Sequence, residues 1–125
     1  MGLDGERTHV KDVLVVDDER SLRLLCRVNL ELEGHRVREA GTLAQARTEL
    51  ERATPDVILL DIHIGADDGL DLLAEIEALD LPTRVVLLSG SSEVGPALHA
   101  RVDHVLGKPF ELPQLAAAVA GVRLR

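Results

Sequence analysis

Residues 57–61 read VILLD, four consecutive apolar residues followed directly by an acidic one. The apolar run is too short for a helix, and half of it is β-branched, which favours a strand. Because the run does not alternate with polar residues, both faces of such a strand must be covered, as in a parallel sheet between two layers of helices. The stretch therefore predicts a central parallel strand that ends at Asp61.

Two further runs have the same character, VLVV at 13–16 and VVLL at 85–88. Two weaker candidates differ from them. Residues 36–38 alternate between polar and apolar side chains, and the apolar pair at 105–106 is brief. We expect the three strong runs at the centre of the sheet and the two weak ones at its edges.

Amphipathic stretches separate these runs. The first, over residues 19–33, is predicted to be a helix that ends before Gly34. Three leucines in it are predicted to share one face: Leu22, Leu25 and Leu32.

The next helices have start signals of their own. Thr42 followed by Gln45 is a capping box, and Asp68 is expected to cap a third helix. The apolar positions of that third helix are Leu70, Leu73, Ile76 and Leu79. Gly95-Pro96 interrupts the fourth helical stretch, while the last begins at Leu112.

Strand and helix thus alternate five times, which is typical of an α/β fold. We predict a single flavodoxin-like (βα)5 doubly wound domain with a parallel sheet of order 2-1-3-4-5 and a short or irregular fourth helix. The chain has 125 residues, enough for one domain. We assign residues 1–10 to an N-terminal tail and residues 11–125 to the domain.

Composition excludes several classes of function. The chain has 14 basic and 22 acidic side chains, a formal charge of −8, so binding to nucleic acid or to an anionic membrane is not expected. The single cysteine, Cys26, cannot form an internal disulfide and is expected to fill the core. No segment resembles a signal peptide or a membrane span. We therefore expect a cytoplasmic protein.

Polar residues follow the predicted strands where each strand ends. Asp17 and Asp18 follow the first strand, Asp61 ends the third, Ser89 ends the fourth, and Lys108 follows the fifth. Because the ligand site of a doubly wound sheet lies at the carboxyl ends of its strands, we expect these side chains to meet in one crevice. Taken singly, each has a simpler interpretation as a turn, capping or solvent-exposed residue.

Three converging carboxylates repel one another unless a cation lies among them. Carboxylate oxygens with room for water suit Mg2+. With the hydroxyl of Ser89 and the ammonium of Lys108, such a crevice can hold a tetrahedral dianion, which is what phosphoryl transfer requires. Asp61, on the central strand, is the predicted nucleophile and would form an aspartyl phosphate.

Four motifs in this order resemble the receiver domain of bacterial two-component response regulators, from about Val13 to Val122. They are VLVVDDE at 13–19, VILLDIHIGADDG at 57–69, VVLLSG at 85–90 and GKPF at 107–110. The resemblance implies that Asp61 accepts a phosphoryl group from a histidine kinase or a histidine phosphotransfer protein.

The same resemblance implies the remaining site residues. Asp18 and Asp61 would ligate Mg2+ directly, Asp17 would act through water, and the backbone carbonyl of His63 would be a further ligand. Ser89 and Lys108 would contact the phosphoryl group. The Lys108-Pro109 peptide would be cis. The other histidines are expected at the surface: His9, His35, His99 and His104.

Two departures from the family pattern stand out. The family often has Met-Pro where this chain has Ile64-Gly65, so we expect a looser loop beside the site. Receivers commonly have an aromatic residue where this chain has Val105, the position that turns inward on activation.

We interpret the chain as a phosphorylation-controlled switch that catalyses only its own phosphorylation and dephosphorylation. No output module is recognised after the last helix, so we expect either a single-domain regulator that acts by docking to an unknown downstream protein or a piece of a longer protein. One alternative is a flavodoxin-like interaction module that is never phosphorylated. Another is a hydrolase of the haloacid-dehalogenase type, which usually has Asp-x-Asp where this chain has Asp61-Ile62-His63.

Overall fold

The computed structural model describes residues 10–90 and 94–121, so the predicted tail at 1–10 lies outside the described residues except for Val10. Five parallel strands form one sheet in the order β2-β1-β3-β6-β7. Their bounds are β1 (Asp12–Val16), β2 (Arg36–Ala40), β3 (Val57–Asp61), β6 (Arg84–Ser89) and β7 (His104–Gly107). The predicted order 2-1-3-4-5 is confirmed, with β6 and β7 as fourth and fifth strands.

β3 lies at the centre of the sheet because its residues can be buried on both faces. All five of its residues are buried. It pairs with β1, where Val13 is opposite Val57, and with β6, where Val86 is opposite Leu59. Successive side chains of a strand point to opposite faces, so the sheet contributes to two separate apolar clusters.

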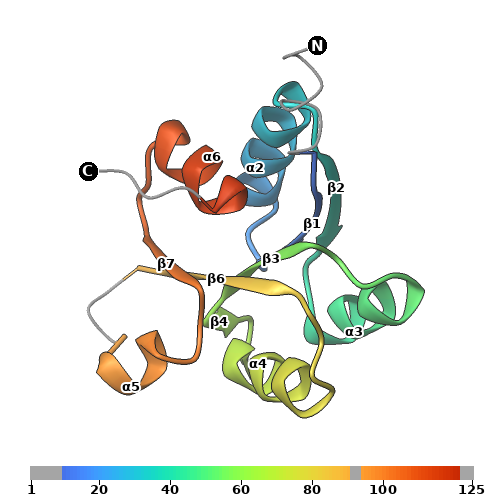
Figure 1. The fold of residues 1–125 in the computed structure, drawn as a ribbon, viewed down its shortest axis with the longest axis vertical. Helices are drawn as coiled ribbons and strands as arrows, with labels where there is room; N and C mark the ends of the chain where they lie inside the picture. The colour runs from blue at the N-terminus through green and yellow to red at the C-terminus, as the bar shows by residue number, and fades with distance from the viewer. Residues whose placement is uncertain (1–9, 91–93, 122–125) are drawn as a thin grey trace.

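Helices cover both faces of the sheet (Figure 1). α2 (Arg20–Leu32) and α6 (Leu112–Ala120) pack on one face. α3 (Leu43–Arg52) and α4 (Gly69–Ala78) pack on the other. The fourth helix of the repeat is α5 (Pro96–His99), which has only four residues, so the expected short helix is confirmed. Among the described residues, no helix is long and apolar enough to span a bilayer.

The caps agree with the sequence in outline. Thr42 Oγ1 accepts from the Gln45 backbone N–H at 3.1 Å. The Gln45 side chain, however, accepts from the Gly41 N–H at 2.8 Å rather than from Thr42. Asp68 caps α4 by accepting from the Leu70 N–H. Gly34, just after α2, has φ +95°, which a side chain would disfavour.

The buried face of α2 differs from the prediction. Leu25 and Leu32 are 44% and 80% exposed, while Cys26 and Leu30 are buried. The row that meets the sheet is Leu22, Cys26 and Leu30, spaced by four residues, and Leu32 lies two residues beyond it on the opposite side. Cys26 is fully buried, which confirms the prediction of a cysteine in the core, and this burial raises the pKa of its thiol to about 12.

A smaller correction concerns α4. Leu79 was expected among its buried positions but is 68% exposed. It is the C-cap residue, where the helix has already ended. Leu72, which the sequence did not single out, is fully buried against the sheet together with Leu73.

Candidate functional site

Four parallel strands deliver the predicted site residues to one edge of the sheet. Asp61 is the last residue of β3 and Ser89 the last of β6, while Asp17 and Lys108 directly follow β1 and β7. The carboxylates of Asp17, Asp18 and Asp61 offer oxygen atoms that all lie within 4.8 Å of one another. Within residues 10–90 and 94–121, no other group of three possible metal ligands is this close. The three aspartates are therefore referred to as the acidic cluster.

Lys108 lies against the acidic cluster. Its Nζ is 2.8 Å from Asp17 Oδ2 and 3.3 Å from Asp61 Oδ2. Its backbone N–H donates to the Ser89 carbonyl at 2.7 Å. This bond attaches the first residue after β7 to the last residue of β6. The Lys108-Pro109 peptide is cis, as the resemblance implies.

Asp17 is held on every side. Its side chain is fully buried, and Oδ1 accepts from the Glu19 backbone N–H at 2.9 Å. Its own N–H donates to the Ala40 carbonyl at 3.1 Å. With Lys108 on Oδ2, both carboxylate oxygens have a donor, and this is how a buried charge is accommodated in a folded protein.

The surroundings of Asp61 disfavour its charged form. Burial raises the pKa of Asp61, and the charge of Asp17 raises it further. Lys108 and a hydrogen bond from the His63 backbone N–H act in the opposite direction without cancelling the rise. Burial lowers the pKa of Lys108, but its pairs with Asp17 and Asp61 outweigh burial, so the net shift is upward and the ammonium stays charged.

The donor set fits a hard cation. Three carboxylates face one ammonium, so the cluster keeps a net negative charge. All three side chains offer oxygen, and Asp18 is exposed, which leaves room for water ligands. Mg2+ prefers this combination of few carboxylates and retained water.

The loop after Asp61 forms a hairpin that the sequence did not predict. β4 (His63–Ile64) pairs antiparallel with β5 (Asp67–Asp68). Gly65, at the turn, has φ +62° and donates its N–H to Asp18 Oδ2 at 2.8 Å. The expectation of a looser loop is therefore corrected, because strand pairing and this bond hold it against the acidic cluster. The His63 carbonyl as a metal ligand stays a prediction.

Gly69 is a site residue that the sequence reasoning missed. A Cβ at this position would lie 1.9 Å from the Asp61 carbonyl oxygen, and the Gly69 N–H donates to the Ile62 carbonyl at 2.6 Å. The first residue of α4 thus touches the backbone of Asp61. A glycine at the start of a helix, where no turn requires one, is a signal for such close approach.

Burial differs among three further residues that the sequence singled out: Ser89, His63 and Val105. Ser89 is buried at the end of β6, and the His63 side chain is exposed. Val105, on the edge strand, is partly buried against the same apolar cluster as α5. His35 and His104, expected at the surface, are instead partly buried, whereas His99 is exposed and His9 lies outside the described residues. His35 Nδ1 accepts from the Lys11 N–H at 2.9 Å.

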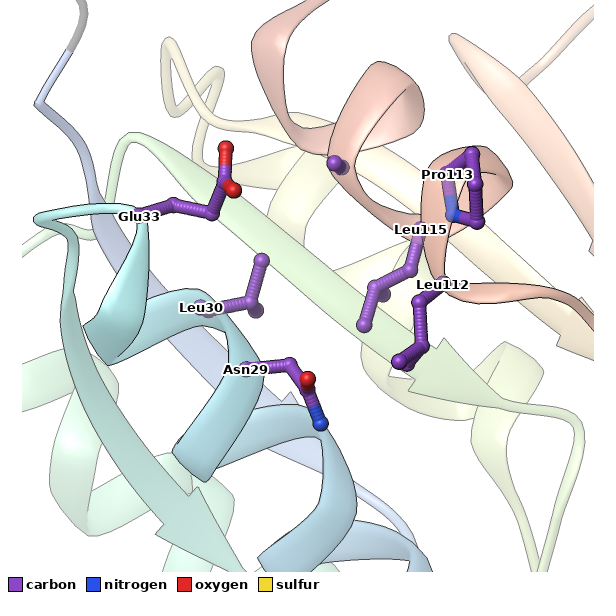
Figure 2. A pocket seen from close by; sticks show the side chains of 7 residues that line it. Asn29, Leu30, Glu33, Leu112, Pro113 and Leu115 are labelled. Carbon is purple, nitrogen blue, oxygen red and sulfur yellow. The ribbon is translucent and has the colours of Figure 1, made fainter.

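Two cavities lie next to α2. One of about 330 Å³ borders the site and is lined by Glu19, Leu22, Leu25, Lys108, Pro109 and Phe110. The other, of about 300 Å³, lies between α2 and α6 around Leu30 and Leu115 (Figure 2). None of the residues that line the second cavity belongs to the acidic cluster, so it has no part in the chemistry considered below.

Comparisons with known proteins agree with this geometry. Residues 13–120 match the family model of the response regulator receiver domain. The KDP operon transcriptional regulatory protein KdpE of Escherichia coli is 35% identical over 85% of this chain and 48% of its own length. Sporulation initiation phosphotransferase F of Bacillus subtilis is 28% identical over 86% of this chain and 89% of its own.

A solved structure gives the same result for the fold. The crystal structure of a response regulator protein from Burkholderia pseudomallei, with a phosphorylated aspartic acid, a calcium ion and citrate, has a TM-score of 0.77 and 28% identity. It covers 87% of this chain and 66% of that one. The chain spans half or less of the transcriptional regulators it matches, as with the 48% of KdpE. Since the family model covers nearly the whole described chain, the chain belongs to the response regulator receiver domain family.

Proposed function

We propose that this domain is a phosphorylation-controlled switch in which Asp61 accepts a phosphoryl group in the presence of Mg2+. The observation that carries the proposal is the acidic cluster, with oxygens within 4.8 Å, and Lys108 at 2.8 Å and 3.3 Å from two of its members. Receiver domains take phosphoryl groups from histidine kinases or histidine phosphotransfer proteins, and we propose a donor of that kind here.

The chemistry follows from the roles of the residues. A carboxylate oxygen of Asp61 attacks phosphorus, a P–O bond forms, and the P–N bond to the donor imidazole breaks with its electron pair returning to nitrogen. The product is an acyl phosphate on Asp61. Water attack at phosphorus later returns the carboxylate and releases inorganic phosphate.

The surrounding residues stabilise the charge on the transferring group. Lys108 brings a permanent ammonium to its oxygens, and Ser89 brings a hydroxyl donor. Asp17 and Asp18, with Asp61 and the His63 carbonyl, are the proposed metal-binding residues. When bound, Mg2+ supplies positive charge that offsets the negative charge of the phosphoryl oxygens.

The relatives support the same proposal. The Burkholderia pseudomallei protein has a phosphorylated aspartic acid together with a divalent cation. The Bacillus subtilis relative is a phosphotransferase, and this chain covers most of its length. We therefore propose that the phosphoryl group is passed between this domain and a histidine-bearing partner, and that docking to a downstream protein transmits the signal.

The test is exposure to acetyl phosphate with Mg2+, read by intact mass. The wild type should gain one phosphoryl mass, whereas Asp61→Asn should keep its circular dichroism spectrum and gain none. Asp67→Asn, an exposed aspartate of β5 outside the acidic cluster, is the control and should react like the wild type. A phosphoryl mass on Asp61→Asn, mapped to another residue, would contradict the assignment.

The two alternatives predict different results. An interaction module that is never phosphorylated would gain no mass in the wild type. A phosphate-ester hydrolase would turn over a chromogenic phosphate ester. We expect no turnover, since Asp61-Ile62-His63 lacks the second aspartate that such enzymes usually have.

A further inference from the structure

Arg23 contacts the acidic cluster from outside it. Its Nη1 donates to the backbone carbonyl of Asp17 at 2.7 Å, and its Nε donates to Glu39 Oε1 at 3.1 Å. The side chain is only 17% exposed, on the first turn of α2. The acceptor is a main-chain oxygen, so this bond from the guanidinium occupies no carboxylate oxygen of the acidic cluster.

The carbonyl of Asp17 is an informative acceptor because it belongs to the peptide unit that leads to Asp18. The six atoms of a trans peptide unit lie in one plane. A charge-assisted bond to the carbonyl therefore sets the orientation of the whole unit and the direction in which Asp18 leaves it. On the other side, the Asp17 N–H is held by the Ala40 carbonyl at 3.1 Å.

Two features hold the guanidinium in place. Glu39 on β2 pairs with Arg23 through one oxygen and with Arg27 through the other, each at 3.1 Å. Gly41 leaves the space that the guanidinium occupies, since a Cβ there would lie 2.9 Å from Arg23 Nη1. Arg27 shares Glu39 with Arg23, but none of its hydrogen bonds reaches the acidic cluster.

We propose that Arg23 is a positioning residue for the metal site, which fixes the peptide between Asp17 and Asp18 so that both carboxylates point at one cation. The inference rests on the proposed Mg2+ site. Removing a residue that orients a metal ligand without touching the metal typically lowers metal affinity by about 10- to 100-fold.

Charge and position make opposite predictions for Arg23. Removing a positive charge near the cluster would by itself strengthen Mg2+ binding, because one source of repulsion is lost. Losing the bond to the Asp17 carbonyl would weaken Mg2+ binding, because Asp17 and Asp18 would no longer be held for a common ligand. The sign of the change in affinity therefore separates the two roles.

The experiment is a calorimetric titration of the unphosphorylated protein with MgCl2. Arg23→Met should weaken binding about tenfold. Gly41→Ala, which changes no charge but displaces the guanidinium, should weaken binding in the same direction. Arg23→Lys keeps the charge but has no fork to span both acceptors, so its affinity should lie between those of the wild type and Arg23→Met. Arg27→Met, the matched control, should bind as the wild type does.

The folded fraction of each variant is checked by circular dichroism and by urea unfolding without metal. If Arg23→Met does not fold, Gly41→Ala and Arg23→Lys decide the question. Tighter binding by Arg23→Met with unchanged binding by Gly41→Ala would overturn positioning in favour of charge. Equal affinities for all variants would overturn the inference alone. A wild type that binds no Mg2+ would overturn the proposed metal site as well.

Discussion

Lys108 Nζ lies 2.8 Å from Asp17 Oδ2, although the two residues are 91 positions apart in the chain. The pair joins the residue after β7 to the residue after β1 across the carboxyl edge of the sheet. Asp17 is fully buried and Lys108 is not. The ammonium therefore offsets a charge that water cannot reach, and it does so at the place proposed for the metal.

Replacing Lys108 with Met keeps an unbranched apolar stem of similar bulk and removes the ammonium group. Without metal, Lys108→Met should unfold more easily than the wild type, by about 2 kcal/mol, because Asp17 and Asp61 lose their common partner. Because no ammonium then competes for these carboxylates, added Mg2+ should raise the melting temperature more in the variant than in the wild type. Differential scanning fluorimetry across a magnesium titration measures both effects, and an equal rise in both proteins would contradict the prediction.

Asp18→Asn keeps an oxygen that can accept from the Gly65 N–H but removes one charge from the acidic cluster. The metal-free protein should be as stable as the wild type or slightly more so, because a like charge has been removed. The stabilisation by Mg2+ should nearly disappear. Asp67→Asn removes an exposed charge on β5 and serves as the control, with its Mg2+ response unchanged. A full magnesium response in Asp18→Asn would count against Asp18 as a ligand.

Gly69→Ala tests the close approach of α4 to Asp61. At an exposed helix position with no close neighbour, this substitution would stabilise the protein, since alanine is the better helix former. Here the new Cβ would lie 1.9 Å from the Asp61 carbonyl oxygen, so the backbone must shift. We expect a loss of about 1–3 kcal/mol in the free energy of unfolding, the usual cost of overpacking. Phosphorylation of Asp61 should also slow.

Gly107→Ala is the matched control for Gly69→Ala, because a Cβ there meets nothing within 4 Å and the φ angle is not positive. Urea unfolding of the two variants separates a clash from a general effect of replacing glycine. If Gly69→Ala were as stable as the wild type, the close approach would not constrain the site.

His35 should make stability depend on pH. Burial lowers the pKa of His35 below its ordinary 6.5, and its Nδ1 must be unprotonated to accept from the Lys11 N–H. Between the folded pKa and 6.5 the unfolded chain binds the proton more tightly, so the free energy of unfolding should fall as the pH decreases through that window. Above 6.5 the contribution is fully present.

The matching variant is His35→Gln, whose amide oxygen can still accept the hydrogen bond. It should unfold with a weaker dependence on pH between 7.5 and 5.5 (about the range in which histidine titrates). His99→Gln, at an exposed position, should keep the dependence of the wild type. Identical pH profiles for His35→Gln and the wild type would refute the assignment.

The sequence was sufficient to predict the sheet and the residues at its edge. The unbroken apolar runs at 13–16, 57–60 and 85–88 form β1, β3 and β6. A strand covered by helices on both faces needs apolar side chains at consecutive positions, so such a run identifies it. The polar residues that follow them had to gather at one edge, because parallel strands end on the same side. Asp17, Asp61, Ser89 and Lys108 were therefore found from local signals alone.

The tertiary structure decided what depends on the reach of side chains between distant segments. Which row of α2 is buried was wrong in the prediction, because leucines on both sides of the helix give no local preference and the seam is set by the sheet beneath it. The hairpin at Gly65 and the close approach of Gly69 to Asp61 depend on how the loop folds back on β3.

The same holds for the two bonds that define Asp17. Lys108 reaches its carboxylate from the far end of the chain, and Arg23 reaches its carbonyl across the first turn of α2. Hydrophobic periodicity is a property of neighbours in sequence and can be read directly. An ion pair or a hydrogen bond over a few ångströms depends on strand register and side-chain rotamer, and these are determined only when the whole sheet has been assembled.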